Sequence, residues 1–174
     1  MTMPAQSDLN LGPSARAAKV LAGLSRTPNR LADVMEELSH WERVWRPGPS
    51  GWNCTEIAGH LVDAEIAFAY RVRTALAEPG KTIDAFDQDA WVSAQAPAAV
   101  ALEEVLSVFA ALRRNLVLLV ARLTEDELSR HYVHSKRGRQ SILDTIVFLQ
   151  SHDERHMVQL GRVSEMARQA RPLA

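Results

Sequence analysis

The chain has 174 residues and a mass of 19.3 kDa, the size of one domain, and 47% of its residues are hydrophobic, enough for a substantial core. Its formal net charge of −1 and pI near 6.6 give no electrostatic reason to bind nucleic acid or an anionic membrane. A single cysteine, Cys54, excludes an internal disulfide framework and a zinc site built from several cysteines.

The apolar runs of the chain are too short for a membrane-spanning helix, which needs about 20 residues; the longest lies near 116–123. Residues 1–14 are rich in Pro, Ser, Asn and Gln and lack the basic start and apolar stretch of a signal peptide. We therefore expect a disordered tail over residues 1–14 and a single domain over 15–170. The composition predicts a cytoplasmic protein with no nucleic-acid and no membrane partner.

The first predicted helical segment runs from about Ala15 to Leu24 and restarts at Thr27 and Pro28. Thr27 suits the N-cap position and Pro28 the first position of a helix. We expect this segment to continue to about Trp45. The residues 46–51, Arg-Pro-Gly-Pro-Ser-Gly, then oppose a helix.

A second long helix is predicted from Asn53 to about Ala77. Asn53 and Glu56 form a capping-box pattern, in which each residue can satisfy the backbone N–H of the other. Apolar residues recur at helical spacing at Ile57, Leu61, Ala64 and Phe68. The dipeptide at 79–80, Pro-Gly, ends the helix, and an acidic, aromatic loop is expected over 83–91.

The remaining elements predict a helical bundle. A third helix is expected from near Pro97 to about Leu123, and a capping-box pattern at Thr124 and Glu127 predicts one short turn after it. Residues 131–139 are polar and are expected to form a loop with a little extended structure. A fourth helix begins near Ser141. Four long helices without an internal repeat predict an all-α fold, a four-helix bundle.

Three histidines lie on the inward faces of these helices. His152 and His156 are four residues apart, so both imidazoles project from one face of the last helix. Burying two imidazoles side by side is unfavourable unless each nitrogen has a partner, and a divalent ion supplies one. His60 faces the same interior from the second helix. The three residues predict a metal site with an open coordination position, as catalytic metals require; ordinary hydrogen-bonded core histidines are the alternative.

Other polar and aromatic residues allow two interpretations each. Gln159, one turn beyond the histidine pair, could orient a bound water or substrate, or could be an ordinary partly buried polar residue. Trp91 lies in a long predicted loop and is the best candidate among the tryptophans to line a ligand pocket. The tryptophans could line a ligand pocket or close the ends of the bundle, and a core role is expected for most of them; the other three are Trp41, Trp45 and Trp52.

Competing motifs are weaker. A zincin site needs Glu directly after its first His, where this chain has Asp153. Asp153 and His156 form only half of a ferritin-like di-iron motif. His131 and His134 alternate with other residues in a polar segment, which favours solvent exposure over metal binding. Cys54 could have a lowered pKa near a helix N-terminus, but a lone cysteine is more often inert packing.

Several segments together resemble one family. Residues 51–65, Gly-Trp-Asn-Cys-Thr-Glu-Ile-Ala-Gly-His-Leu-Val-Asp-Ala-Glu, resemble the second-helix signature of the DinB-like (DinB/YfiT) superfamily. Residues 68–71 and 86–91 resemble one branch of it, and residues 152–159 match its pattern His-x-x-x-His-x-x-Gln. The resemblance extends over about 31–161. Two residues depart from the family pattern: Asn53 stands where Ser or Thr is commoner, and Arg155 stands where members often have another His.

The resemblance implies an up-down-down-up four-helix bundle, frequently a homodimer, with a divalent metal such as nickel or zinc held by His60, His152 and His156. It also implies enzymes that use low-molecular-weight thiols. Three neutral imidazoles leave the full charge on the ion, so a bound thiol or water is strongly acidified. We therefore predict a metal-dependent thiol S-transferase acting on a small molecule. A metal-dependent hydrolase and a non-catalytic, dimeric metal- or ligand-binding stress-response protein are the alternatives.

Overall fold

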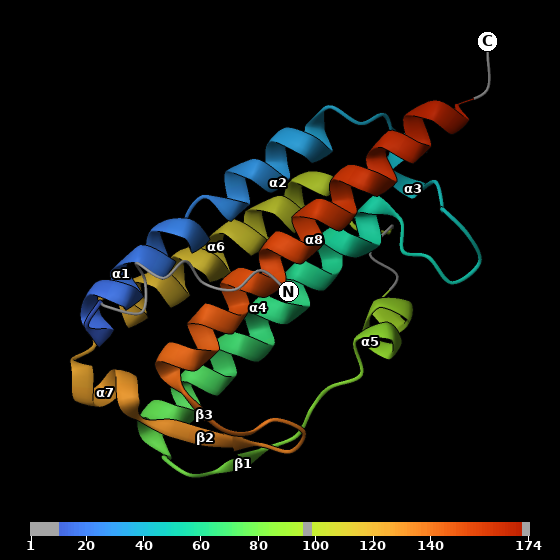
Figure 1. The fold of residues 1–174 in the computed structure, drawn as a ribbon. Coiled ribbons are helices and arrows are strands. Elements are labelled where there is room, and N and C mark those ends of the chain that lie inside the picture. Colours follow the sequence, from blue (N-terminus) through green and yellow to red (C-terminus); the bar gives the residue numbers. More distant parts are fainter. Residues whose placement is uncertain (1–10, 96–98, 172–174) are drawn as a thin grey trace.

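The structure is a computed structural model and describes residues 11–95 and 99–171. Four long helical segments form a bundle (Figure 1): α1 (Pro13–Leu24) followed by α2 (Thr27–Glu36), α4 (Cys54–Ala77), α6 (Leu102–Val120) and α8 (Ile142–Ala170). The shorter elements are α3 (His40–Val44), β1 (Thr82–Ile83), α5 (Gln88–Gln95), α7 (Glu125–Ser129), β2 (His131–His134) and β3 (Gly138–Ser141). The predicted all-α four-helix bundle is confirmed.

The packing of the helices defines their directions. α4 packs against both α6 and α8, and α1 and α2 pack against the same two helices from the other side. One apolar cluster joins the end of α2 to the starts of α4 and α6 and to the end of α8, through Met35, Ile57, Val105 and Leu160. The chain therefore enters α4 and α6 at the same end of the bundle, so these two helices are parallel and α8 is antiparallel to them. This is the predicted up-down-down-up topology.

Local sequence signals set most helix starts. Asn53 Oδ1 accepts a hydrogen bond from the Glu56 N–H at 2.9 Å, and Glu56 Oε2 accepts one from the Asn53 N–H at 3.0 Å. The same reciprocal arrangement begins α7 at Thr124 and α8 at Ser141. Side-chain oxygens thus satisfy backbone N–H groups that a helix start otherwise leaves unpaired. The predicted starts of these three helices are confirmed.

The first helical segment differs from the prediction at both ends. It begins at Pro13, two residues before the predicted start, while the first ten residues of the predicted tail lie outside the described residues. Its continuation α2 ends at Glu36 rather than near Trp45. The reason is a further capping box, in which Ser39 accepts from the Glu42 N–H and begins the separate helix α3.

The connection between α4 and α6 also differs from the prediction. The expected loop over 83–91 contains the first turn of α5, which begins where Asp87 Oδ1 accepts hydrogen bonds from the N–H groups of Asp89 and Ala90. α6 begins at Leu102, after the predicted start at Pro97, which lies outside the described residues. The connection is therefore a crossover with structure of its own (Figure 1).

A small three-stranded sheet ties this crossover to the bundle. Its order is β1-β2-β3, with β1 parallel to β2 and β2 antiparallel to β3. β2 and β3 are the extended structure expected within 131–139. Gly138 follows the turn between them with a φ of 70°, a left-handed conformation that glycine adopts without steric cost. β1 belongs to the crossover, so the sheet holds the crossover beside the second half of α4 (Figure 1).

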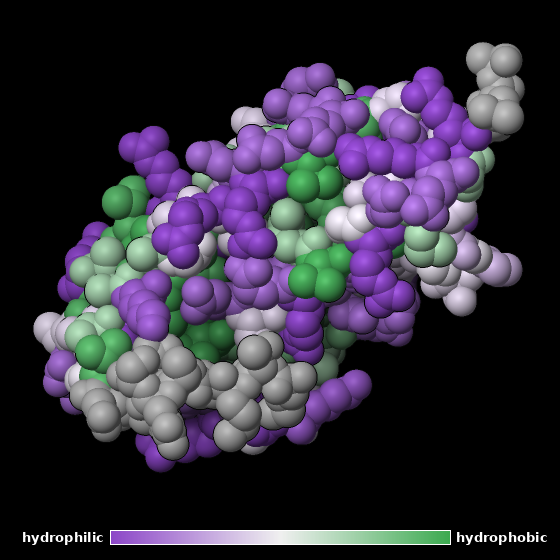
Figure 2. Space-filling model, turned by 45° about the horizontal axis from the view of Figure 1, so that its top comes forward, coloured by the Kyte–Doolittle hydropathy of each residue, from purple (hydrophilic) through white to green (hydrophobic). Residues whose placement is uncertain are grey.

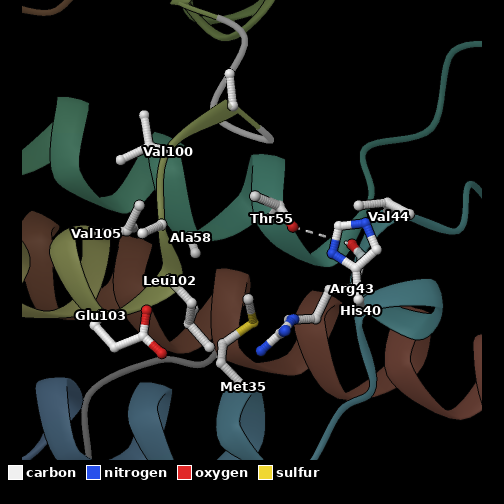
Figure 3. A pocket seen from close by; sticks show the side chains of 12 residues that line it. Met35, His40, Arg43, Val44, Thr55, Ala58, Val100, Leu102, Glu103 and Val105 are labelled. Atoms are coloured by element: carbon white, nitrogen blue, oxygen red, sulfur yellow. Dashed lines mark hydrogen bonds between the residues drawn. The ribbon is translucent and has the colours of Figure 1, made fainter.

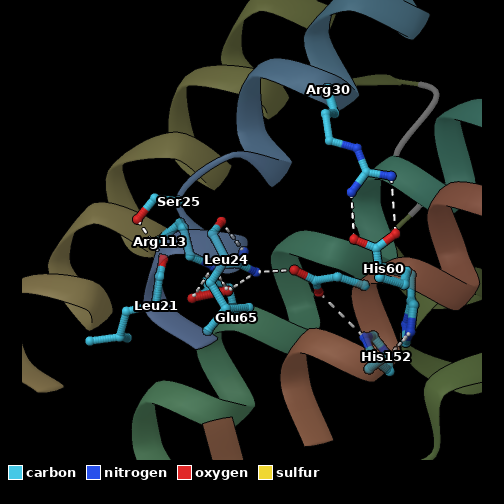
Figure 4. Close-up of polar contacts among 10 residues, drawn as sticks. Leu21, Leu24, Ser25, Arg30, His60, Glu65, Arg113 and His152 are labelled. Atoms are coloured by element: carbon cyan, nitrogen blue, oxygen red, sulfur yellow. Dashed lines mark hydrogen bonds and ion pairs between the residues drawn. The ribbon is translucent and has the colours of Figure 1, made fainter. Parts of the chain in front are cut away.

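A layer of buried charges divides the core (Figure 4). Arg113 on α6 is 1% exposed and donates hydrogen bonds to both carboxylate oxygens of Glu65 on α4, at 2.8 to 3.1 Å. It also donates to the Leu24 carbonyl at 2.8 Å and lies 2.8 Å from Asp153 Oδ2 on α8. Apolar clusters occupy the bundle on either side. One guanidinium thus connects all four helical segments at a single level.

One face of the bundle is mainly polar. Figure 2 shows one face on which hydrophilic residues predominate and hydrophobic residues form small, separate patches. No helix within the described ranges is both long enough and apolar enough to cross a membrane. α8, which has 29 residues, illustrates this because it buries His152 and Asp153 together with its apolar residues.

Replacing Arg113 by Ala should destabilise the protein strongly. The change leaves the carboxylates of Glu65 and Asp153 buried without their cation, which costs about 3–5 kcal/mol. Urea unfolding followed by circular dichroism measures this loss. Arg114→Ala is the matched control, since that neighbour is exposed, and it should change the unfolding free energy by less than about 0.5 kcal/mol. Equal effects of the two substitutions would contradict a structural role for the charged layer.

Candidate metal centre

The three histidines singled out in the sequence come together in the interior of the bundle. His60 on α4 is fully buried, His152 on α8 is buried, and His156 is half-buried. The centroids of the three rings lie between 4.4 and 5.0 Å apart. One ring nitrogen from each residue lies within 4.8 Å of the others. Within the described ranges, no other three His, Cys, Asp or Glu residues converge in this way.

Helix geometry explains this convergence. His152 and His156 are one turn apart, so the antiparallel packing of α4 on α8 brings His60 to face both of them. The capping box at Asn53 fixes where α4 begins and so fixes the phase of its inward face, on which Ile57, His60 and Leu61 are buried. The arrangement therefore follows from one helix start and one spacing of four.

The imidazoles of His60 and His152 face each other through their Nε2 atoms. The Nε2 atoms of His60 and His152 are 3.0 Å apart, and the Nδ1 atoms of both residues are buried with no hydrogen-bond partner. If one Nε2 donates to the other, the accepting ring carries its proton on Nδ1, where it is left buried and unpaired. A divalent cation would accept both Nε2 lone pairs and replace the contact between them; each Nδ1 would then carry a proton, which on His152 faces Asp153 Oδ1 at 3.7 Å.

Gln159 positions the third imidazole. Its Oε1 lies 2.9 Å from His156 Nδ1, and because a carbonyl oxygen only accepts, the imidazole donates from Nδ1. The Nε2 lone pair of His156 is then free for a cation, in the tautomer typical of metal-ligating histidines. Gln159 is partly buried, as one of its two predicted roles requires. The other role, to orient a bound water or substrate, stays a prediction, because the contact observed is with the imidazole of His156.

Asp153 brings the charged layer to the edge of the site. Its Oδ1 lies 3.7 Å from His152 Nδ1, and its Oδ2 is held by Arg113. Figure 4 shows Arg113 and Glu65 on one side of this contact and His60 with His152 on the other. A carboxylate next to the outer nitrogen of a ligating histidine increases the basicity of the inner one.

Burial keeps the imidazoles neutral. Burial, together with the neighbouring imidazoles of His156 and His152, lowers the pKa of His60 to about 3. Burial and the imidazole of His152 likewise lower the pKa of His156 to about 4. Both side chains are therefore unprotonated at neutral pH, the form in which histidine binds metals.

Trp52 is a site residue that the sequence reasoning did not single out. Its ring lies 4.8 Å from the His60 ring and stacks on His156 at 6.1 Å, while it stays half-buried. It directly precedes the capping residue Asn53, eight residues before His60. This position could have indicated that Trp52 lies near the site, because a residue just before a helix start can fold back over the first turns.

The core role expected for most of the tryptophans does not hold for Trp41, Trp45 and Trp52, none of which is fully buried. Trp41 is 38% exposed, and the other two are half-buried. Trp41 and Trp45 belong to the short helix α3 and its end, which lie at the surface and cannot enclose so large a ring. Trp91 on α5 is 36% exposed and contacts Phe86, with ring centroids 4.6 Å apart. Its role in a ligand pocket stays a prediction.

Cys54 is not activated by the helix start. The side chain is fully buried, and burial raises the pKa of its thiol to about 11. Loss of hydration of the thiolate therefore outweighs any favourable effect of the helix N-terminus. Of the two interpretations offered by the sequence, the lowered pKa is wrong and inert packing agrees with the structure.

The native protein should accordingly resist thiol reagents. With its pKa raised from 9.0 to about 11, Cys54 exposes about two orders of magnitude less thiolate at pH 8 than an ordinary cysteine. Reaction with a chromogenic disulfide at pH 8 should be slow for the folded protein and complete within minutes in denaturant. Fast labelling without denaturant would show that this end of α4 opens.

The two histidines of β2 differ from each other in exposure. His131 is half-buried, whereas His134 is 2% exposed, so the expected solvent exposure of His134 is wrong. The alternation of the strand is the reason, because Tyr132 and His134 share the face that packs on the bundle. His134 Nδ1 accepts a hydrogen bond from the Lys136 N–H at 3.1 Å. Burial and the nearby charge of Arg137 lower the pKa of His134 to about 4.

His134 should therefore make the fold acid-sensitive. Its pKa is about 4 when folded and near 6.5 when unfolded, so the unfolded state binds more protons between these values. The stabilising contribution is complete above pH 6.5 and is lost as the pH falls through about 4. An NMR titration of the His134 ring should have its midpoint well below 6, and His134→Gln should weaken the pH dependence of unfolding. A midpoint near 6.5 would contradict this.

Two cavities of the described structure lie away from the histidine cluster. One of about 440 Å³ lies at the α3 end of the bundle and is lined by Met35, His40 and Arg43 among others (Figure 3). The other, of about 690 Å³, lies between α4 and α6 beside Asp63 and Gln95. None of the three clustered histidines lines either cavity. The chemistry of the cluster is therefore assigned from its side chains, not from these cavities.

A bundle of this topology with three convergent histidines defines a class of metal-site helical proteins, and comparison with known proteins gives the family. Residues 23–160 match the family model of the DinB superfamily. The match covers most of the chain, so the protein belongs to the DinB superfamily. The resemblance seen in the sequence motifs is thereby confirmed.

Relatives in this superfamily carry a common name. A protein of Oceanobacillus iheyensis named "putative metal-dependent hydrolase" is 29% identical over 134 residues, 76% of each chain. A second protein of that organism is 24% identical over 133 residues, 76% of this chain and 77% of its own, and one of Bacillus mycoides is 22% identical over 139 residues, 79% of each chain. Both have the same name.

A solved structure shares the fold. YfiT from Bacillus subtilis, described as "a probable metal-dependent hydrolase with an unusual four-helix bundle topology", matches with a TM-score of 0.84. The match covers 95% of this chain and 93% of that one at 17% sequence identity. At this identity the similarity shows the common architecture, including the parallel pair α4 and α6.

Proposed function

We propose that the protein is a metal-dependent hydrolase in which His60, His152 and His156 hold one divalent cation, zinc or nickel. The observation that carries the proposal is the convergence of three imidazoles, two buried and one half-buried, with those of His60 and His152 facing each other through Nε2 at 3.0 Å. The names of the bacterial relatives support the reaction class. Three histidine ligands leave a coordination position open, as catalytic sites do.

The residues around the imidazoles have separate tasks in this proposal. When bound, a divalent cation supplies a Lewis acid that lowers the pKa of a water or thiol at the open position. Gln159 holds His156 in the tautomer with a free Nε2, and Asp153 faces the outer nitrogen of His152. Trp52 covers His60 and His156 and restricts the access of bulk water.

Thiol transfer is the second candidate. The observation that favours it is the uncharged ligand set, because three neutral imidazoles leave the whole charge of the cation available to hold a thiolate. In this case the three histidines would hold a cation that stabilises a low-molecular-weight thiol as its thiolate, with the proton released to solvent. The sulfur would form a C–S bond to an electrophilic carbon of the small molecule, which would lose its leaving group. The same site thus serves either reaction, and the substrate decides between them.

The proposal extends to the molecular context. A small-molecule substrate, a homodimer and a cytoplasmic location are expected from the sequence and its family resemblance. Sedimentation velocity tests the homodimer directly. A protein that binds the cation but turns over no substrate would correspond to the non-catalytic alternative.

The ligand assignment predicts metal content. Purified wild-type protein should contain about one zinc or nickel ion per chain by mass spectrometry, and His60→Ala, His152→Ala and His156→Ala should each lower this value towards zero. His40→Ala is the control, since His40 is exposed and lies outside the cluster. Titration with Ni²⁺ should also quench the fluorescence of Trp52, which stacks on the cluster. Unchanged metal content in the three variants would refute the assignment.

The reaction class is tested on metal-loaded protein. Hydrolysis of activated esters and amides should be detectable for wild type and should fall by at least about tenfold in His156→Ala. Parallel assays with glutathione, bacillithiol and mycothiol against electrophilic acceptors test thiol transfer. Metal binding with activity in neither assay would support the non-catalytic alternative.

A further inference from the structure

Arg71 is a buried cation without a counter-ion. It lies in the second half of α4 and is 4% exposed. Throughout the described part of the chain, no residue forms a hydrogen bond or an ion pair with its guanidinium. The contacts are instead with the faces of Phe68 and Phe86, whose centroids lie 4.9 and 5.7 Å from Cζ. A guanidinium keeps its charge and its five N–H donors at neutral pH, so burying it unpaired is unfavourable.

The treatment of Arg113 shows how this chain pairs a structural arginine. Arg113 is equally buried and meets the carboxylates of Glu65 and Asp153 together with a backbone carbonyl. Arg71 has none of these. Its guanidinium is therefore suited to a partner that comes from outside the chain.

A second unpaired group lies close to Arg71. Tyr132 is fully buried on β2, and its hydroxyl has no hydrogen-bond partner among the described residues. β2 packs on α4, and Tyr132 belongs to the same buried cluster as Phe68, the ring that Arg71 contacts, and Val72, the next residue on α4. A hydroxyl and a guanidinium can both donate hydrogen bonds to one oxyanion.

The surroundings of these two residues are positively charged. Arg137, in the turn between β2 and β3, places its guanidinium 4.4 Å from the centroid of Phe148. Arg155 contacts the same ring at 5.5 Å. The Phe148 ring lies 5.8 Å from Phe68, the ring that Arg71 contacts. Such a group of cations attracts anions.

Phe68 connects this region to the histidine cluster. The centroid of its ring lies 4.9 Å from Arg71 Cζ and 5.9 Å from the centroid of the His152 ring. One phenyl ring thus separates the guanidinium from an imidazole of the candidate metal centre. A small molecule with a reactive group at the histidines and a negative group at Arg71 would span this distance.

We propose that Arg71 and Tyr132 bind an oxyanion, a carboxylate or a phosphate, of the substrate beside the three-histidine centre. The substrates of the site are then small anionic molecules. That the anion belongs to a substrate rests on the proposed function, whereas the binding of an anion requires no turnover. A structural alternative exists, in which Arg71 only clamps Phe86 of the crossover onto α4 through its cation–π contacts.

The first experiment measures anion binding to the purified protein. Thermal unfolding is followed with increasing sodium acetate or sodium phosphate, against sodium chloride at equal ionic strength. Wild type should show saturable stabilisation by acetate, by phosphate or by both, and the more effective anion identifies the preferred group. Arg71→Met should weaken this binding about 10- to 100-fold, the value of a charge-assisted hydrogen-bond pair.

The controls separate the anion site from the metal site and from the fold. Arg73→Met, on an exposed arginine of the same helix that bonds to Asn115, should leave anion binding unchanged. His60→Ala should retain anion binding, because the site does not need the cation. Tyr132→Phe removes one hydroxyl and keeps the buried ring, so it tests the site even if Arg71→Met were to fold poorly; it should weaken binding about tenfold.

The second experiment asks whether the anion belongs to the substrate. The 4-nitrophenyl ester of acetic acid is neutral, and the 4-nitrophenyl monoester of succinic acid carries a carboxylate. Wild type should prefer the anionic ester in kcat/KM. Arg71→Met should raise the KM for that ester about 10- to 100-fold and leave the neutral ester within about twofold.

Three results would overturn the inference. Anion effects that do not saturate in wild type, or that persist in Arg71→Met, show that Arg71 is not an anion site. Destabilisation of Arg71→Met with unchanged anion binding supports the clamp instead. Saturable binding that depends on Arg71 supports the site even if neither ester is hydrolysed, and in that case it is the proposed hydrolase function that fails.

Discussion

The contact of Arg113 with two buried carboxylates is the constraint on which the rest of the structure depends. It joins α1, α4, α6 and α8 at one level, with apolar clusters on both sides. A shift of any one helix by a turn would leave a buried charge without its partner, which is far more unfavourable than a mismatch between apolar side chains. The charged layer therefore specifies the register of the bundle, while the apolar clusters supply most of the driving force.

The same layer determines where the imidazoles lie. His60 is five residues before Glu65 on α4, and His152 directly precedes Asp153 on α8. Once the carboxylates meet Arg113, the two histidines face each other without further adjustment. The layer has two carboxylates for one guanidinium, so a cation at the imidazoles is favoured electrostatically. On the far side of Phe68 the charge is positive, because Arg71 lies there. The acidic layer, the imidazoles and the basic Arg71 therefore follow one another through the interior.

The sequence predicted those features that depend on near neighbours along the chain. The capping box at Asn53 and the spacing of His152 and His156 involve residues three or four apart, and helix geometry alone relates them. The boundary at Ser39 was open to the same reasoning and was missed, because the apolar pattern continued across it. The family resemblance supplied the topology, which local patterns do not determine.

Long-range contacts account for what the sequence did not predict. The local sequence does not distinguish Arg71 from Arg73. Arg71 is buried and unpaired and Arg73 is exposed and bonded to Asn115, because β2 and the crossover cover only one side of α4. In the same way, the sequence places Tyr132 in a predicted polar loop, whereas in the structure the alternation of β2 points its side chain inward. Trp52 reached the imidazoles only because the segment before α4 folds back on it.

The parallel arrangement of α4 and α6 has a consequence for how such a protein can diversify. The segment that connects the two helices must return along the length of the bundle. The entropic free-energy cost of closing such a loop rises by only about 0.6 kcal/mol for each doubling of its length. The crossover can therefore be lengthened, shortened or exchanged at small thermodynamic cost, although it carries the aromatic cover of Arg71. The four-helix frame, which carries the three histidines and Arg71, and the crossover, which contributes Phe86, are thus separable parts of the chain.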